Sequence, residues 1–335
     1  MRLFGCDLDR EIAVVAEIGV NHEGDPAVAS RLLRLAAESG AHAVKFQTFT
    51  PARYASASDP ARLARVTGFC LDEATHRRLA REAAELGVAM FSTAVSDDVV
   101  PLLAELFPAI KIASGDLDFE PVIRAAARTG KPVILSTGLG TVDEVDRAVG
   151  WVRDEVGAAA LRDRLVLMQC VSAYPAPIEE ASVLGMPYLA ERTGLRVGYS
   201  NHVIGPEACY AAAAHGAAMI EVHFTDRKTG REFRDHALSF EPDDLKSLRA
   251  VLPRIRASLG GRDKRRMPSE LGNLKAVRKG LVASRDLPAG TVLADSDLMY
   301  ARPQTEFAAG ERAAVVGKKL GVSLKRGELI PRGGV

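Results

Sequence analysis

The chain has 335 residues, of which 47% are hydrophobic and 26% charged, an ordinary globular composition with enough chain for one large domain and a small one. Its formal net charge is +1, so no global field favours nucleic acid or an anionic membrane surface. The four cysteines show no disulfide or metal spacing, and no apolar stretch or N-terminal signal core is long enough to enter a membrane. We therefore expect a cytoplasmic protein.

Short apolar, β-branched runs alternate with longer segments of helical period, which is typical of parallel βα units. The predicted strands are Ile12–Ile18, Ala43–Gln47, Ala89–Ser92, Ile110–Ala113, Val133–Ser136, Leu165–Val171, Arg196–Tyr199 and Met219–His223. The predicted helices include Pro26–Ser39, Glu73–Leu86, Asp98–Leu106, Pro121–Thr129, Val142–Val156 and Pro206–His215. Eight such strands in about 225 residues predict a closed (β/α)8 barrel, the TIM-barrel fold. No GxGxxG follows the first strand, which argues against an open dinucleotide-binding sheet.

The character of the chain changes after this barrel domain, which we expect over residues 1–258. Residues 259–275 are polar, basic and glycine-containing, and are predicted to be a linker. Residues 276–335 show short strand and turn patterns and predict a small β-rich domain. Because about 60 residues bury little core alone, this domain is expected to dock on a barrel or on a partner subunit.

Polar or charged residues stand at the carboxyl end of every predicted strand, where an active site forms in a parallel barrel. They are Glu17, Lys45, Gln47, Ser92, Thr93, Ser114, Asp116, Ser136, Thr137, Ser172, Tyr174, Ser200, Asn201, His202 and His223. One polar strand end has no meaning by itself, since every strand must end somewhere. Polar residues at all eight ends predict a single site at the mouth.

His202 and His223 are candidate metal ligands, because neutral imidazole is a common ligand of divalent cations. Taken alone, they could equally be core or surface histidines with satisfied hydrogen bonds. With no third soft ligand apparent, the pair predicts an open shell completed by water and substrate oxygens, which suits Lewis-acid catalysis. Mn2+ or Mg2+ fits such a shell, and Zn2+ is an alternative.

A second set is cationic and rich in hydroxyl groups, which suits a phosphate and a carboxylate. It comprises Lys45, Lys111, Ser114, Ser136 and Ser200. Lys45 could instead be the Schiff-base lysine of an aldolase, although a metal and a Schiff base are alternative electrophile strategies. Glu17 is a candidate base or substrate-orienting carboxylate, and the structural alternative is that it only pairs with Lys45.

These residues lie in segments that closely resemble the sialic acid (N-acetylneuraminate) synthase family, in order and over essentially the whole chain. The matching segments are residues 16–22 (AEIGVNH), 44–49 (VKFQTF), 111–115 (KIASG), 134–138 (ILSTG), 198–202 (GYSNH) and 221–225 (EVHFT). Residues 278–283 (RKGLVA) and 301–303 (ARP) resemble that family's C-terminal antifreeze-protein-like (SAF) domain.

The resemblance implies condensation of phosphoenolpyruvate with an open-chain N-acyl hexosamine, such as N-acetylmannosamine, to give a nine-carbon 2-keto sugar acid and phosphate. It implies that His202 and His223 hold the metal and act in catalysis with Glu17 and Asp116. The phosphoenolpyruvate site would comprise Lys45, Lys111, Ser114, Ser136, Ser172 and Ser200. The sugar site would comprise Gln47, Tyr174, Asp235 and Arg302, with Arg302 supplied by the partner in a domain-swapped homodimer.

The departures from the family pattern cluster around the acceptor pocket. The family commonly has Glu at Asp116, Asn at Ser172, Asp at Asn201, a Gly-Pro-Asp-His-like loop at residues 233–236 and Arg-Pro-Gly at residues 302–304. A related synthase that joins phosphoenolpyruvate to a different aldehyde is therefore the alternative enzyme hypothesis. A non-catalytic sugar-binding protein is the alternative outside enzymes, and the lysines and serines of the phosphate set weigh against it.

Overall fold

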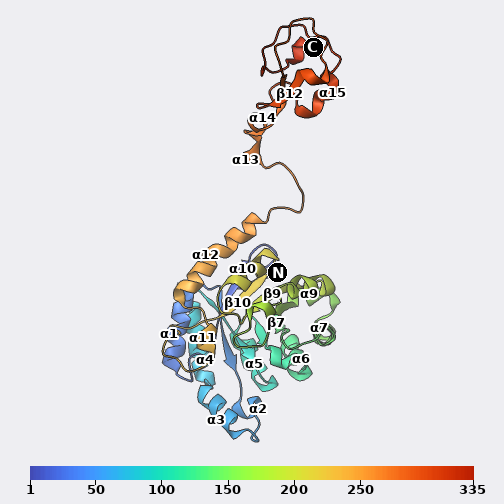
Figure 1. The fold of residues 1–335 in the computed structure, drawn as a ribbon. Coiled ribbons are helices and arrows are strands. Elements are labelled where there is room, and N and C mark those ends of the chain that lie inside the picture. Colours follow the sequence, from blue (N-terminus) through green and yellow to red (C-terminus); the bar gives the residue numbers. More distant parts are fainter. The chain divides into compact units, whose positions relative to one another are not determined.

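The computed structural model describes residues 1–335, which form two compact units, Met1–Gly260 and Gly261–Val335. The first unit confirms the predicted barrel: eight parallel strands close in the order β10-β3-β4-β5-β6-β7-β8-β9 (Figure 1). The strands are β3 (Ala13–Gly19), β4 (Ala43–Thr48), β5 (Ala89–Ala94), β6 (Ile110–Ile112), β7 (Val133–Ser136), β8 (Leu165–Gln169), β9 (Arg196–Asn201) and β10 (Met219–His223). Their ends agree with the predicted ranges to within two residues.

Helices surround this barrel. The six predicted helices are present as α1 (Pro26–Glu38), α4 (Glu73–Glu85), α5 (Val100–Leu106), α6 (Glu120–Arg128), α7 (Val142–Val156) and α10 (Glu207–Ala214). Others were not among the predictions: α2 (Pro51–Tyr54), α3 (Pro60–Phe69), α8 (Ala158–Arg164), α9 (Gly185–Thr193), α11 (Asp235–Leu238) and α12 (Pro242–Ser258). None of the helices is long and apolar enough to cross a membrane.

The two ends of the barrel differ. An N-terminal hairpin, β1 (Arg2–Leu3) with β2 (Cys6–Asp7), lies at the end where the strands begin, and the ring of Phe4 stacks on Phe91 with centroids 4.7 Å apart. At the other end, α2 and α3 interrupt the connection from β4 to α4 and carry a separate apolar cluster that includes Phe49, Val66 and Phe69 (Figure 1). Apolar side chains make up most of the barrel core, and most of the predicted site residues lie at or near the carboxyl ends of the strands.

The second unit has a small core of its own, in which Leu281, Leu293, Phe307 and Ile330 are buried. Its regular strands are β11 (Gly280–Ala283) and β12 (Leu298–Ala301), and its helices are α13 (Pro268–Leu271), α14 (Leu274–Val277) and α15 (Arg312–Val315). Other strand patterns of residues 276–335, near residues 287–292 and 324–330, form only isolated bridges, such as Leu287 with Leu324. Residues 259–275, predicted to be a linker, contain the short helix α13.

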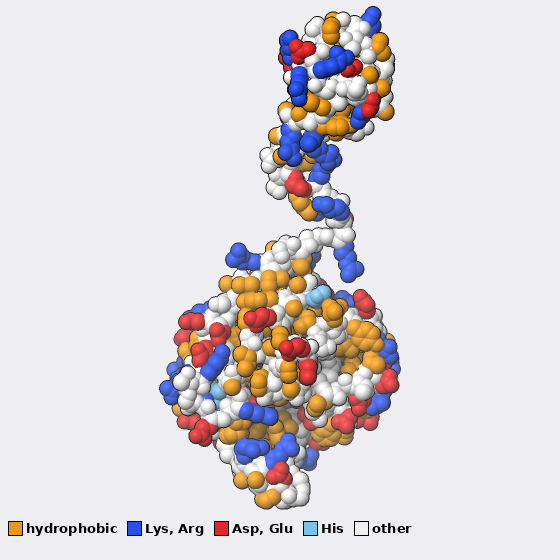
Figure 2. Space-filling model, viewed as in Figure 1, with side chains coloured by type: hydrophobic (Ala, Val, Ile, Leu, Met, Phe, Trp, Pro, Cys, Tyr) orange, Lys and Arg blue, Asp and Glu red, His pale blue; other side chains and the backbone are white.

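Charged side chains of both signs are mixed over the visible face of the barrel unit, whereas the charged side chains of residues 261–279 in the second unit are mostly Lys and Arg (Figure 2). This distribution agrees with a formal net charge of +1. Charges inside the barrel, where side chains are shielded from water, interact more strongly than charges on this surface.

Candidate active site

Four charged side chains meet inside the barrel and form what we call the charge quartet: Glu17 of β3, Lys45 of β4, Lys111 of β6 and Glu221 of β10. All four are at most 4% exposed. The Lys45 ammonium lies 3.3 Å from Glu17 Oε2 and 3.0 Å from Glu221 Oε1. Lys111 reaches the same Glu221 oxygen at 3.3 Å, and Ser200 donates a hydrogen bond to it at 3.1 Å. Two buried cations thus share one carboxylate.

Burial and the charges of neighbouring groups have opposing effects on the pKa values of the quartet. Burial raises the pKa of Glu17 to about 7, against the opposing effect of Lys45. Burial also disfavours a charged Lys45, but Glu17 and Glu221 outweigh it and raise the pKa of that lysine. Burial lowers the pKa of Lys111. A Schiff-base lysine must lose its proton to attack a carbonyl, so the two carboxylates beside Lys45 argue against that role.

Gly19, at the end of β3, controls how Glu17 is presented. The register with β4 shifts between Glu17 and Gly19, and Gly19 has φ +55°. A Cβ atom at Gly19 would lie 2.9 Å from Glu17 Oε1, which is closer than real Cβ contacts. The glycine therefore permits both the backbone turn and the position of the carboxylate.

A second group, the serine pocket, surrounds Gly138 after β7 and comprises Ser114, Ser172 and Cys170. The backbone N–H of Gly138 donates to Ser114 Oγ at 3.1 Å, and Cys170 Sγ lies 3.1 Å from the same oxygen. A Cβ atom at Gly138 would lie 2.8 Å from Ser114 Oγ and 3.0 Å from Cys170 Sγ. Only glycine leaves these hydroxyl groups room, and convergent hydroxyl donors suit an anionic oxygen.

The remaining residues of the predicted phosphate set lie on the barrel wall. Ser136 ends β7 and is 3% exposed, and Ser200 lies on β9 against Glu221. The structure thus places the predicted phosphate residues at consecutive strand ends between β6 and β9 and on β4.

His202 and His223 lie together at the mouth, with ring centroids 5.4 Å apart. His202 Nδ1 contacts the backbone oxygen of Val171, which assigns the ring proton to Nδ1 and leaves the Nε2 lone pair available. Burial lowers the pKa of His202 to about 4, and burial together with the neighbouring His202 lowers the pKa of His223 well below its usual value. Both imidazoles are therefore neutral at pH 7, and His223 Nδ1 is buried without a hydrogen-bond partner.

Two neutral imidazoles with unused nitrogens fit a divalent cation. No group of three or more His, Cys, Asp or Glu side chains is arranged to hold a metal. Water and substrate oxygens would therefore have to complete the shell, which is the arrangement of catalytic rather than structural metal sites.

Of the predicted sugar residues, Tyr174 lies directly against the histidine pair. The ring of Tyr174 lies 4.2 Å from that of His202 and 5.7 Å from that of His223. Asp235 opens α11 and is 7% exposed, and burial raises its pKa. Gln47 is half-buried on β4. Arg302 belongs to the C-terminal unit, where it is exposed and donates to the backbone oxygen of Val277.

Asp116 lies in the short turn Ser114–Asp116 after β6, and we expect it to make the stability of the folded protein depend on pH. Burial, reinforced by Asp118, raises its pKa from 3.8 to about 6. The folded barrel therefore holds this proton more tightly than the unfolded chain, so the associated stability is full below about pH 4 and is lost as the pH rises through about 6. We expect Asp116→Asn to raise the melting temperature relative to wild type at pH 8 and to leave it unchanged at pH 4.

The control for Asp116 is Asp118→Asn, which removes only the neighbouring negative charge. It should lower the pKa of Asp116 and so narrow the pH range over which stability is lost. The stability of this variant should still depend on pH. Parallel melting-temperature profiles for wild type and Asp116→Asn from pH 4 to pH 8 would contradict this account.

Two residues of the site had no predicted role. Glu221 stands two residues before His223 on β10, and side chains two apart on a strand share a face, so alternation could have identified it. Arg234 lies over the Tyr174 ring, with its guanidinium carbon 4.8 Å from the centroid. The sequence contains no pattern that predicts this contact, because the two residues belong to different loops.

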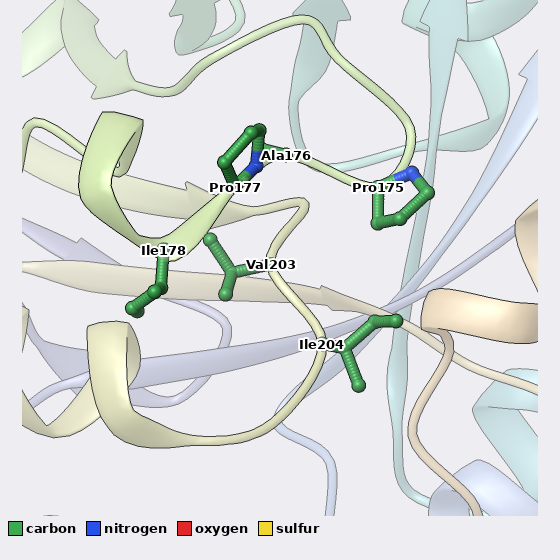
Figure 3. A pocket seen from close by; sticks show the side chains of 6 residues that line it. All are labelled: Pro175, Ala176, Pro177, Ile178, Val203 and Ile204. Atoms are coloured by element: carbon green, nitrogen blue, oxygen red, sulfur yellow. The ribbon is translucent and has the colours of Figure 1, made fainter.

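A shallow groove of about 290 Å3 adjoins the Tyr174 and His202 loops, and Figure 3 shows its lining. It is lined by Pro175, Ala176, Pro177, Ile178, Val203 and Ile204. All six side chains are apolar, so this groove cannot perform acid–base chemistry. The reactive groups are those of the quartet, the serine pocket and the histidine pair.

Comparisons with known proteins find relatives along almost the whole chain. Residues 32–264 match the NeuB family, and residues 278–333 match the SAF domain. The chain is 34% identical over 335 residues to the N,N'-diacetyllegionaminic acid synthase of Campylobacter jejuni, covering 96% of this chain and 99% of that protein. It is 30% identical over 296 residues to the N-acetylneuraminate-9-phosphate synthase of Homo sapiens, covering 84% and 80% respectively.

Comparison with solved structures also finds similarity to a sialic acid synthetase. The N-acetylneuraminic acid (sialic acid) synthetase of Leptospira borgpetersenii, in complex with citrate, superposes with a TM-score of 0.74 at 28% identity. The superposition covers 79% of this chain and 90% of that one.

Proposed function

The chain belongs to the NeuB family, and from that premise we propose that it condenses phosphoenolpyruvate with the open-chain aldehyde of an N-acyl amino sugar. The products are a nine-carbon 2-keto sugar acid of the sialic acid type and inorganic phosphate. The relatives named as legionaminic acid and N-acetylneuraminate-9-phosphate synthases support this reaction class.

The observation that carries the proposal is the charge quartet beside the serine pocket. Phosphoenolpyruvate is a small trianion, and it needs cations and hydroxyl donors in a shielded place. Lys45 and Lys111 are both buried and both held against Glu221, while Ser114 and Ser172 converge on Gly138. We assign the phosphate and carboxylate of the substrate to these lysines and to Ser114, Ser136, Ser172 and Ser200.

The residues have distinct tasks in the reaction. A bond forms between C3 of phosphoenolpyruvate and the aldehyde carbon, and the aldehyde oxygen gains a proton. The cationic C2 then takes up water, and the tetrahedral intermediate loses phosphate to leave the ketone. Glu17, whose pKa of about 7 allows it to hold or release a proton near neutrality, serves this proton traffic together with Asp116. Gln47, Tyr174 and Asp235 hold the sugar.

His202 and His223 would hold a divalent cation, for which we propose Mn2+ or Mg2+. When bound, the cation supplies Lewis-acid polarisation of the aldehyde oxygen. Tyr174 packs against both rings and fixes their orientation on the open side.

The test is phosphate release from phosphoenolpyruvate in the presence of a panel of aldehydes. We expect release with N-acyl amino sugars and little with simple aldoses, and mass spectrometry should detect the nine-carbon acid. Release only with a different aldehyde class would favour the alternative synthase. Binding of a sugar without any consumption of phosphoenolpyruvate would favour the non-catalytic reading.

We further propose a domain-swapped homodimer in which Arg302 contacts the sugar bound by the partner. Support comes from its exposed position in the small second unit and from the resemblance of residues 301–303 to the family. Light scattering should give twice the mass of one chain, and Arg302→Ala should raise the KM of the acceptor about tenfold while leaving that of phosphoenolpyruvate unchanged. Exposed Arg326 provides a matched control. A monomer with full activity would contradict the proposal.

A further inference from the structure

Arg234 occupies a distinctive place between the last barrel strand and α11. Its guanidinium lies over the Tyr174 ring, and Tyr174 in turn packs on both histidines. Its Nε donates to Asp235 Oδ1 at 3.1 Å. A cation thus stands at the sugar end of the site, at a position where neither the quartet nor the serine pocket needs one.

The two terminal nitrogens of Arg234 make no hydrogen bond within the structure, and its side chain is 67% exposed. The nearby Arg231 behaves differently: its terminal nitrogens bind Asp226 and Glu23, and its side chain is 17% exposed. Arg231 therefore serves the fold of the loop. The planar guanidinium group of Arg234 has free terminal N–H donors that are exposed to solvent at the mouth of the barrel.

The backbone that carries Arg234 is held firmly. Ser239 Oγ donates to the backbone oxygen of Asp235 at 2.7 Å, and Asn21 from the β3–α1 loop donates to Ser239 Oγ at 3.0 Å. His236 contacts Thr225 on one side and Glu23 on the other. A donor on a fixed backbone discriminates between ligands better than one on a mobile loop, because less ordering is needed on binding.

We propose that Arg234 is a specificity-determining residue for the acceptor sugar. Its terminal nitrogens donate hydrogen bonds to an acyl carbonyl of an uncharged amino sugar. The inference rests on the proposed function and names its acceptor class. Asp235 already balances the charge of Arg234 at 3.1 Å, so a phosphate dianion seated on this fork would lie beside a buried carboxylate and be repelled. A neutral carbonyl oxygen gains the donors without that cost.

The experiment compares wild type, Arg234→Ala, Arg234→Lys and a control, Arg192→Ala, with three acceptors. The acceptors are an N-acetylhexosamine, its 6-phosphate and a 2,4-diacetamido hexose. Arg192 is the matched control because it is also an exposed arginine paired with an aspartate, Asp146, but lies on the outer helix α9. Phosphate release yields KM and kcat for both substrates.

We expect Arg234→Ala to raise the KM of the uncharged acylated acceptors by about ten- to hundredfold, as for loss of hydrogen bonds from a charged donor. The KM of phosphoenolpyruvate should change less than about twofold. Arg234→Lys should show the same loss, since lysine can still pair with Asp235 but lacks the planar fork. Arg192→Ala should match wild type.

Each other outcome has a defined meaning. Wild type that consumes phosphoenolpyruvate with none of the acceptors overturns the proposed function and this inference together. Turnover by wild type with an unchanged acceptor KM in Arg234→Ala overturns the inference alone. If Arg234→Ala weakens only the use of the 6-phosphate acceptor, Arg234 recognises a phosphorylated sugar and the proposed acceptor class is wrong. If Arg234→Lys keeps the wild-type acceptor KM, Arg234 only holds Asp235 in place.

Discussion

Replacing Glu221 with glutamine is expected to lower the free energy of unfolding of the barrel by about 3–5 kcal/mol, the usual cost of removing one partner from a buried ionic group. Glu221 Oε1 accepts from Lys45 at 3.0 Å, from Lys111 at 3.3 Å and from Ser200 at 3.1 Å. Glutamine keeps the shape but leaves the two ammonium groups with only Glu17 as an anionic partner. Denaturant unfolding followed by circular dichroism measures the loss.

A double variant separates the charge effect from the change of side chain. Lys111→Met combined with Glu221→Gln removes one cation and one anion and leaves Glu17 paired with Lys45. We expect the double variant to be more stable than the sum of the two single changes implies. Glu120→Gln is the surface control, because Glu120 pairs with Arg124 at 46% exposure and should cost at most about 1 kcal/mol. Additive losses in the double variant would contradict the shared-carboxylate account.

The barrel could be predicted because its information is local. Each strand is a short run of mostly apolar residues, and helices such as α1 and α4 are followed by glycines with positive φ, Gly40 and Gly87. α12 shows the limit of that reading: Pro253 lies inside it, and proline normally ends a helix. Beyond the proline, Ile255 still packs against the barrel core and Arg256 donates to the backbone oxygen of Asp9 at 2.8 Å, and such tertiary contacts outweigh the local preference.

The internal arrangement of the site could be predicted only in part. The strand-end rule identified Glu17 and Lys45, and Lys111 was predicted only as a member of the cationic set, but β6 and β10 are four strands apart in the closed order. Lys111 and Glu221 therefore meet across the barrel interior, at a place that exists only after closure. The contact between Arg234 and Tyr174 likewise joins two loops 60 residues apart in the chain, and no periodicity in either loop reports it.

Removing the divalent cation is expected to reduce phosphate release by roughly a thousandfold, because Lewis-acid stabilisation contributes several kcal/mol and each 1.4 kcal/mol is about tenfold in rate. Treatment with EDTA should produce this loss, and added Mn2+ should restore the activity of wild type. His202→Ala should show a similar loss that Mn2+ does not restore. His202 and His223 are neutral and adjacent, and His223 Nδ1 has no hydrogen-bond partner, so removing either ring takes away one of the two protein ligands proposed for the cation.

A binding measurement distinguishes loss of the cation from loss of the fold. Mn2+ should raise the melting temperature of wild type with the logarithm of its concentration above the dissociation constant, and this increase should be absent from His202→Ala. His215→Ala is the control, since His215 caps α10 on the exposed surface and should leave both the melting shift and the rate unchanged. Full activity after exhaustive chelation would assign the polarisation of the aldehyde to Lys45 or Lys111 instead. In that case, Lys111→Met, rather than His202→Ala, would have to lower kcat without changing the KM of phosphoenolpyruvate.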